Sequence, residues 1–223
     1  MKIVFALGGS VVNPDGIDEE YVRAFANFAK ELAKKHKLGI VIGGGRLARR
    51  KIEEARKKGA NQSECDYIGI DASRYNASVV SQAMGMAPHI PESLKDARRI
   101  MDDKGIVIMG GTEPGHSTDA VAVILAEYAN ADMVFKVTDV PGIYDKDPQK
   151  FKDAKMFKEL AIGQLEKMVV GLSQEAGKYE LVDIVAVEVL KRSGVKMIAL
   201  DGHDLDNINH AIDGKSFVGT VIR

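Results

Sequence analysis

The sequence predicts a three-layer α/β/α sandwich with a mainly parallel central sheet. Short apolar runs rich in β-branched residues alternate with amphipathic stretches along the whole chain, which is the pattern of parallel strands joined by crossover helices. Several of these runs stop at glycines. In sheets of this kind, ligands bind beyond the carboxyl ends of the strands, so the glycine-rich ends are the first place to look for a site.

Composition favours a single globular domain over residues 1–223. Hydrophobic residues make up 45% and charged residues 28% of the chain, as in soluble proteins. The net charge of -1 favours neither nucleic acid nor an anionic membrane as a partner, so any anion site must be local. No apolar run approaches the roughly 20 residues that span a bilayer, and no signal peptide is evident, so we expect a cytoplasmic protein. The single cysteine, Cys65, excludes an internal disulfide and is expected to be buried.

The first quarter of the chain sets the pattern. Residues 2–7 are β-branched and apolar, as expected for a parallel strand buried on both faces. Asp18 can cap a helix whose apolar residues recur at spacings of three and four over 21–32. Residues 38–42 are a second buried strand, and a charged helix is expected over 46–58, mostly with a solvated face.

The middle of the chain continues the alternation. A helix is expected over 63–84 because its apolar residues form one stripe. A short strand at 87–90, a short helix at 93–101, a strand at 105–109 and a helix at 121–128 should follow.

The last third begins with a strand at 132–138. The polar stretch 139–151 contains two prolines and a glycine, and it is expected to be an exposed functional loop because strong secondary structure resumes after it. The remaining expected elements are two helices, a strand, a helix and a final edge strand, at 163–170, 182–193, 196–200, 204–212 and 217–222.

Glycine loops follow three of the predicted parallel strands, at 8–10, 43–45 and 110–111. All three should therefore lie on one rim of the sheet, close to the arginines of the stretch RLARR that starts at Arg46. One such loop often only turns the chain, but three on one rim beside guanidinium groups suit phosphate. Neither the dinucleotide fingerprint nor the P-loop motif follows the first strand.

The stretch GGTEPGHSTD at 110–119 links a predicted strand to a predicted helix. Its glycines allow close approach of a ligand, and Ser117, Thr118 or Asp119 can cap the helix. The first N–H groups of that helix would point at an anion, which makes a phosphorylated substrate a good fit.

Four motifs carry a resemblance to a known family: LGGS from Leu7, IGGGRLAR from Ile42, GGTEPGHSTDAVA from Gly110 and TDVPGIYDKDP from Thr138. Together they resemble the amino-acid kinase family and, within it, the archaeal type of uridylate kinases. The likeness runs from the first predicted strand to the last.

The resemblance implies that ATP phosphorylates UMP in pyrimidine nucleotide (CTP) biosynthesis, with Mg²⁺ carried mainly by the nucleotide phosphates and no dedicated protein metal site. It implies a UMP-binding N-terminal half (about 1–130), an ATP-binding C-terminal half (about 131–223) and a homohexamer. The implied catalytic residues are Lys136, Asp119 and Arg49. The implied UMP contacts are Gly44, Asp66, Thr112, Glu113, Pro114, Gly115, His116, Ser117 and Thr118. The implied ATP contacts are Gly9, Ser10, Gly45, Arg49, Thr138, Asp139, Tyr144 and Asp147.

The chain departs from the family at two positions. Most members have a lysine that bridges the transferred phosphate where this chain has Ala6, and Pro141 replaces a usual aspartate. Lys136 is the preferred replacement cation, because a lysine inside an apolar strand is otherwise costly to bury; Lys178 is the weaker candidate.

Several residues have a second interpretation. Lys136 can also be a strand residue that snorkels to solvent, Asp119 can be only a helix cap, and His116 can be a solvated loop residue. For the whole chain, the alternatives are another kinase of the superfamily, acting on a small carboxylate, carbamate or phosphate, and a nucleotide-binding sensor or storage protein without turnover.

Overall fold

The computed structural model describes residues 1–86, 89–172 and 182–223. The strands of these residues are β1 (Lys2–Leu7), β2 (Lys37–Ile42), β3 (Ile106–Met109), β4 (Met133–Thr138), β5 (Glu159–Leu160), β6 (Lys196–Asp201) and β7 (Thr220–Ile222). They form one sheet in the order β3-β2-β1-β4-β6-β7-β5. The five strands from β3 to β6 are parallel, whereas β7 runs antiparallel to β6, so the prediction of a mainly parallel sheet is confirmed.

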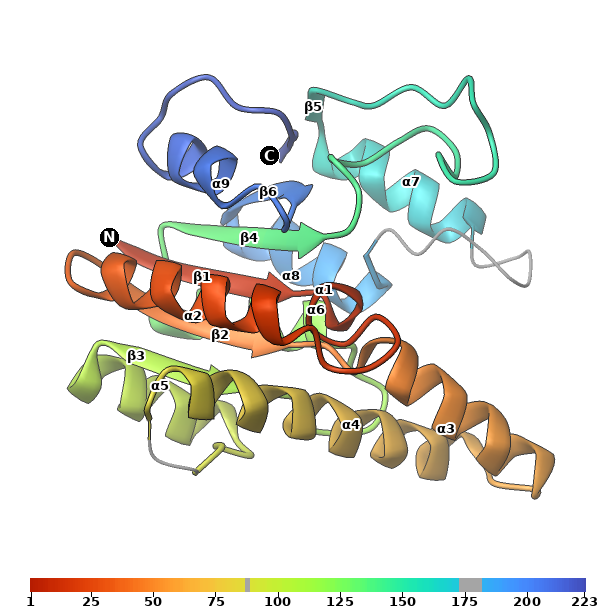
Figure 1. The fold of residues 1–223 in the computed structure, drawn as a ribbon. Coiled ribbons are helices and arrows are strands. Elements are labelled where there is room, and N and C mark those ends of the chain that lie inside the picture. Colours follow the sequence, from red (N-terminus) through yellow and green to blue (C-terminus); the bar gives the residue numbers. More distant parts are fainter. Residues whose placement is uncertain (87–88, 173–181) are drawn as a thin grey trace.

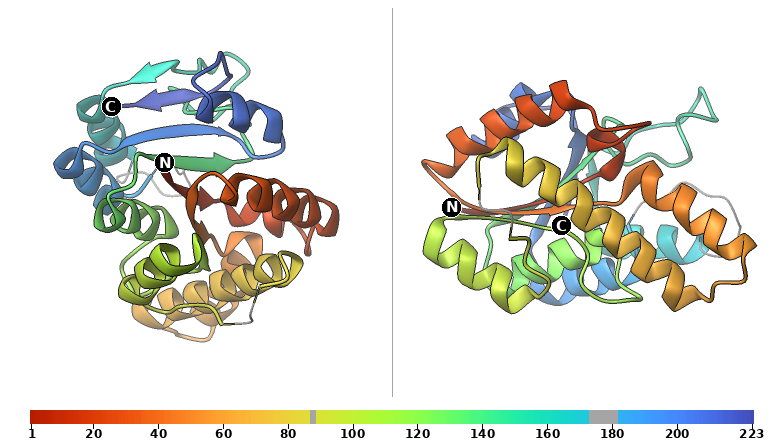
Figure 2. Two further views of the ribbon diagram at one scale, coloured as in Figure 1. Left: turned by 90° about the vertical axis from the view of Figure 1, so that its left-hand side faces the viewer. Right: turned by 60° about the horizontal axis from the view of Figure 1, so that its bottom comes forward.

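Helices cover both faces of this sheet (Figures 1 and 2). The helices of the described residues are α1 (Gly9–Val12), α2 (Glu19–Ala33), α3 (Gly45–Lys57), α4 (Gln62–Ala83), α5 (Leu94–Lys104), α6 (Thr118–Ala129), α7 (Ile162–Leu172), α8 (Ile184–Ser193) and α9 (Leu205–Ile212). Buried side chains of α2, α4 and α9 form one core with the sheet, and those of α5, α6 and α8 form the other. The fold is therefore the predicted three-layer α/β/α sandwich.

The central strand β1 shows why both layers are needed. Ile3, Phe5 and Leu7 belong to one core, while the alternating residues Val4 and Ala6 belong to the other. All five are buried, because successive side chains of a strand point to opposite faces. Both faces of β1 must therefore be covered.

Helix α3 lies at the carboxyl ends of the strands, where it packs along the first half of α4 and extends past the sheet (Figure 1). Helix α4 begins with a capping box, in which Asn61 accepts from the N–H of Glu64 and the Glu64 carboxylate accepts from the N–H of Asn61. This capping box stabilises the N-terminus of α4.

Three of the sequence-based expectations differ from the structure. The last strand is not at the edge, because β7 lies between β6 and β5. The edge strand β5 was not predicted, since two residues are too few to show a periodic pattern. Of the strand expected at 87–90, Ala87 and Pro88 lie outside the described residues, and residues 89–90 are not in a strand.

None of the described helices has both the length and the apolar character required to cross a membrane.

Candidate active site

The first two glycine loops touch each other at the carboxyl ends of β1 and β2. A Cβ atom placed on Gly9 would lie 2.2 Å from the backbone nitrogen of Gly45 and 2.4 Å from the carbonyl oxygen of Gly43. Gly45 has a φ of 60°, in the left-handed region that favours glycine. The glycines thus allow two backbones to meet, and they bring the amide groups of both loops to one point on the rim.

The third glycine loop reaches the same rim. A Cβ atom on Gly43 would lie 3.3 Å from Oγ1 of Thr118, at the start of α6. Gly110 lies close to α4, since its Cβ would be 2.6 Å from the backbone nitrogen of Arg74. As the sequence predicts, the loops that follow β1, β2 and β3 lie together.

Buried amide side chains hold the second loop in place. Asn76 of α4 donates from Nδ2 to the carbonyl oxygen of Gly43 at 2.9 Å and of Gly44 at 3.3 Å. Its Oδ1 accepts from Nδ2 of Asn13 at 3.0 Å. Both asparagines are buried, and buried polar side chains need such partners. Sequence reasoning missed this pair; the available signal was a polar residue on the apolar side of a predicted helix.

Two other residues of α4 hold the third loop. The Ser73 Oγ accepts from the N–H of Gly111 at 2.7 Å. Arg74 donates from Nε to the carbonyl oxygen of Gly111 at 3.1 Å and from Nη2 to that of Thr112 at 3.4 Å. Sequence reasoning missed these residues too, because their partners lie more than 35 residues away along the chain.

The segment 112–118, here called the TEPGHST loop, closes one side of the rim. Thr112 is buried, whereas Glu113, Gly115, His116 and Ser117 are exposed and Pro114 and Thr118 are half-buried. Asp66 of α4 reaches this loop, where its Oδ2 accepts from the N–H of Gly115 at 2.9 Å. Its Oδ1 accepts from Gln62 Nε2 at 2.8 Å. The structure thus joins Asp66 to the loop with which the sequence analysis groups it.

An ion pair lies at the same rim. Lys136 Nζ is 2.5 Å from Asp119 Oδ2, and the two side chains are only 16% and 21% exposed. Lys136 is in register with Ala6 of β1 on one side and with Ala199 of β6 on the other. Residues in register on neighbouring strands point to the same face of the sheet. Lys136 therefore shares its face with Ala6, one strand away, and two alanines leave room for its side chain.

Two helix N-termini meet beside this ion pair. Ser117 caps α6 by accepting from the N–H of Ala120, and Asp183 caps α8 by accepting from the N–H of Ala186. The Ser117 hydroxyl also donates to the other carboxylate oxygen of Asp183. Of the three capping candidates, Ser117 is the cap, so Asp119 remains available to Lys136. Asp183 was missed by sequence reasoning, although a polar residue directly before the apolar run IVAV is a capping signal.

The loop after β4 carries the remaining candidates. Thr138 lies at the rim, because its carbonyl oxygen accepts from the N–H of Gly202 at 2.7 Å and its Cα is 3.7 Å from a Cβ placed on Gly8. Its hydroxyl donates to the neighbouring Asp139 at 3.1 Å. Tyr144 pairs with Met156 in a β-bridge. Asp147 accepts from the N–H of Gln149 at 2.9 Å and stabilises a turn.

Three candidate residues remain to be placed, namely Arg49, Ser10 and Lys178. Arg49 of α3 is exposed, and the described part of the chain offers its side chain no partner. Ser10, the last residue of the first loop, is half-buried in α1. Lys178, the alternative cation, lies outside the described residues. Among the described residues, no three His, Cys, Asp or Glu side chains gather as a metal site would require.

The rim carries groups that can bind an anion. It combines closely packed backbone amides, two helix N-termini and the amine of Lys136, all of which stabilise negative charge. A sequence model of the amino acid kinase family matches residues 1–201. This chain belongs to the amino acid kinase family.

Relatives within that family match the chain over nearly its whole length. A uridylate kinase from Methanobrevibacter smithii is 40% identical over 224 residues, covering 100% of this chain and 99% of that protein. A uridylate kinase from Methanocaldococcus jannaschii is 41% identical over 218 residues, covering 95% and 96%. The crystal structure of uridylate kinase from Archaeoglobus fulgidus superposes with a TM-score of 0.87 at 38% identity, with both chains covered completely. UMP kinase from Bacillus anthracis, at 18% identity and a TM-score of 0.81, shares the fold.

Proposed function

We propose that this chain is a UMP kinase, which transfers the γ-phosphoryl group of ATP to UMP and releases UDP and ADP in pyrimidine nucleotide (CTP) biosynthesis. The observation that carries the proposal is the Lys136–Asp119 ion pair, held at 2.5 Å where three glycine loops meet. The full-length relatives named as uridylate kinases support UMP as the acceptor.

The residues divide between the two nucleotides. UMP would bind in the N-terminal half of the single domain, with its phosphate at Gly44, its ribose at Asp66 and its base at the TEPGHST loop. The triphosphate of ATP would lie along Gly9, Ser10, Gly45 and Arg49. Its nucleoside would lie in the C-terminal half against Thr138, Asp139, Tyr144 and Asp147. The Lys136 amine would then stand between the two phosphates.

Phosphoryl transfer explains why the rim has these groups. Both reactants are anions, so the protein has to hold them in line and stabilise the charge that spreads over the transferred group. A phosphate oxygen of UMP is already ionised at neutral pH, and therefore no general base is required. Lys136 and the backbone amides stabilise that charge, while Asp119 orients the lysine. Mg²⁺, held mainly by the phosphates of ATP, would neutralise part of their charge.

In the site, Asp66 already accepts a hydrogen bond from Gly115. A ribose hydroxyl would therefore replace or share that bond, so that binding of UMP and the position of the TEPGHST loop are coupled. This explains how one carboxylate can both order the loop and contribute to recognition of the acceptor.

A coupled assay of ADP release with a panel of monophosphates (UMP, dUMP, CMP, AMP and GMP) tests the function. We expect turnover with UMP, dependent on Mg²⁺. Turnover only with another acceptor would point to a different kinase of the superfamily. Tight nucleotide binding without turnover would point to a sensor or storage protein.

The Asp66→Asn variant tests the division between the two halves. The KM for UMP should rise while the KM for ATP stays nearly unchanged, because only the acceptor loses a charged hydrogen-bond partner. If the KM for ATP rose alone, the two halves would be assigned the wrong way round. The homohexamer implied by the family resemblance and the cytoplasmic location remain predictions; light scattering on the purified protein measures the first.

A further inference from the structure

Two of the residues assigned to ATP lie on a hairpin between β4 and β5. Residues 143–157, here called the 143–157 hairpin, contain Tyr144 and Asp147, and Figure 1 shows this part of the chain beyond the carboxyl end of β4. The two ends of the hairpin meet where the N–H of Phe157 donates to the carbonyl oxygen of Ile143 at 2.9 Å. The β-bridge of Tyr144 is the next rung. The positions of both side chains therefore depend on how the base of the hairpin is fixed.

A hydroxyl group completes this base. In a regular antiparallel pair, two opposite residues exchange both N–H···O bonds. Within the described residues, Ile143 and Phe157 share one direct bond, the one donated by Phe157. Oγ1 of Thr220, in β7, accepts from the N–H of Ile143 at 2.9 Å and donates to the carbonyl oxygen of Phe157 at 2.5 Å. The hydroxyl thus takes the place of the second bond and uses both its donor and its acceptor.

The surroundings give this hydroxyl little freedom. Thr220 is fully buried and Ile143 is 2% exposed. Thr220 is in register with Ala199 of β6, so its backbone is part of the sheet, and a β-branched side chain has few rotamers. A Cβ atom on Gly142 would lie 2.7 Å from Oγ1 of Thr220. The glycine therefore lets the start of the hairpin approach the hydroxyl closely.

The chemistry at position 220 requires a hydroxyl and not only a side chain of the right size. A valine there would have nearly the same shape, but it would leave the N–H of Ile143 and the carbonyl oxygen of Phe157 without this partner. Buried backbone groups that lose a partner are costly, so the base would have to open until both groups found water. Tyr144 directly follows Ile143 and would move with it.

We propose that Thr220 is a positioning residue for the phosphoryl donor: its hydroxyl fixes the base of the 143–157 hairpin and thereby sets the affinity for ATP. The proposal rests on the proposed function, in which Tyr144 and Asp147 contact ATP. Thr220 itself does not need to touch the nucleotide, because it acts through the backbone of Ile143 and Phe157. The acceptor side, at Asp66 and the TEPGHST loop, should not respond to it.

Equilibrium dialysis of ATP and of UMP tests this in the full chain. Thr220→Val should raise the dissociation constant for ATP by at least about tenfold, because two hydrogen bonds at the hairpin base are lost. The dissociation constant for UMP should change by less than about twofold. Thr220→Ser keeps the hydroxyl and should restore the affinity for ATP to within about threefold of the unmodified protein.

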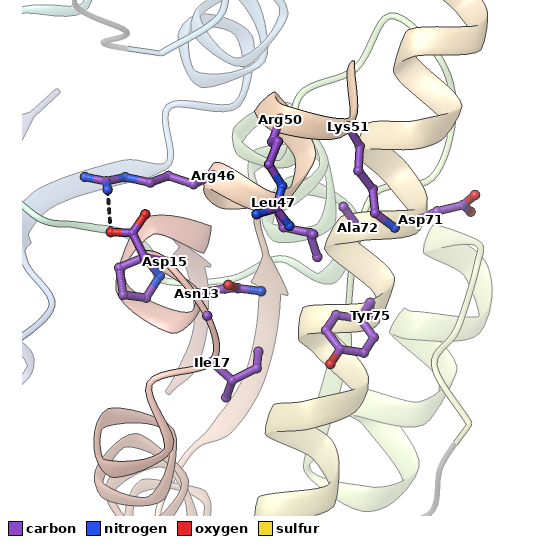
Figure 3. Close-up of a pocket in the computed structure, with 12 residues that line it drawn as sticks. Asn13, Asp15, Ile17, Arg46, Leu47, Arg50, Lys51, Asp71, Ala72 and Tyr75 are labelled. Carbon is purple, nitrogen blue, oxygen red and sulfur yellow. Dashed lines mark hydrogen bonds and ion pairs between the residues drawn. The ribbon is translucent and has the colours of Figure 1, made fainter. Parts of the chain in front are cut away.

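Two control variants separate this role from a general loss of stability. Ile222→Val removes a buried methyl group from the same strand and should lower the melting temperature without weakening ATP binding. Asp15→Ala removes an exposed ion pair with Arg46, which Figure 3 shows at the start of α3, and should change neither affinity. Gly142→Ala is a second test if Thr220→Val does not fold: its Cβ would press on the Thr220 hydroxyl, and ATP binding should weaken while UMP binding is kept.

The proposal is overturned if Thr220→Val, or Gly142→Ala in its place, binds ATP as the unmodified protein does. It is also overturned if Thr220→Ser is as impaired as Thr220→Val, or if Ile222→Val weakens ATP binding equally, since the strand and not the hydroxyl would then be responsible. Dialysis measures binding without turnover. An unmodified protein that binds ATP but does not phosphorylate UMP would therefore contradict the proposed kinase activity and leave the comparison of these variants decisive for Thr220.

Discussion

Replacing Lys136 by alanine should remove most of the catalytic rate and little of the binding. The side chain is only 16% exposed and lies 2.5 Å from Asp119, so an effective dielectric constant of about 20 is appropriate. A unit charge about 4 Å from the transferred phosphoryl group then contributes about 4 kcal/mol. That corresponds to a fall in kcat of about 10³-fold. The unpaired Asp119 carboxylate would add repulsion between the protein and the phosphates.

The assay is the coupled measurement of ADP release, with kcat and the two KM values determined separately. An interaction made mainly in the transition state lowers kcat and changes KM little, so we expect the KM for UMP to change by less than about threefold. Lys196→Ala, at the exposed start of β6 and therefore at the opposite end of the sheet, is the matched control. Its kcat should stay that of the unmodified protein.

A charge transplant tests the geometry. Because Ala6 and Lys136 are in register on neighbouring strands, a lysine at position 6 would approach the rim from the same face. Adding Ala6→Lys to the Lys136→Ala variant should recover at least about tenfold in kcat, as expected for one restored charge. An unchanged kcat in Lys136→Ala would refute the catalytic role of Lys136. A severe loss without any recovery would refute the equivalence of the two positions.

Three further predictions follow from single contacts. Gly9→Ala should lower the free energy of unfolding by about 1–3 kcal/mol, because its Cβ would overlap the second glycine loop. Gly163→Ala, the control in α7, where a Cβ would meet open space, should raise the free energy of unfolding by about 0.5–1 kcal/mol. Thermal unfolding measures both variants. Arg74→Ala should raise the KM for UMP and leave the KM for ATP unchanged, because Arg74 donates to two carbonyl oxygens where the TEPGHST loop begins. Arg99→Ala, which removes an ion pair on the surface of α5, is the control and should change neither KM. Tyr21→Phe should stabilise the protein, because the buried Tyr21 hydroxyl has no partner among the described residues. Burial and two neighbouring carboxylates raise the pKa of the Tyr21 phenol. Above about pH 10 the unfolded chain therefore loses a proton that the folded protein keeps. The free energy of unfolding of the unmodified protein should fall with pH in this range more steeply than that of the variant.

The fold was predictable from the sequence wherever the signal was local. Helix starts are examples: Asp18, Ser93 and Asp204 each accept from a backbone N–H three residues ahead, and such caps can be found without knowing the tertiary structure. The edge of the sheet was not predictable, since β5 is two residues long and exists only because it pairs with β7. A strand that depends on its partner leaves no periodic pattern of its own.

The same distinction applies to the site. The glycine loops could be found from the sequence because strand ends can be located, and the ends of parallel strands share one rim. The residues that hold those loops, Asn76 and Ser73, could not be assigned, because a polar side chain on a buried helix face shows that a partner exists but not which one. Their partners are set by how α4 packs against β2 and β3, which involves residues far apart in sequence.

The position of Lys136 relative to Ala6 differs between the sequence and the folded sheet. Along the chain, Ala6 is a missing lysine and Lys136 is an unrelated residue 130 positions away. In the sheet they are direct neighbours, because β1 pairs with β4 and the register sets Ala6 opposite Lys136. Phosphoryl transfer requires positive charge at a point in space, and either strand can supply it from the same face. In the proposed site, the small side chain at position 6 leaves room for the amine that the neighbouring strand provides.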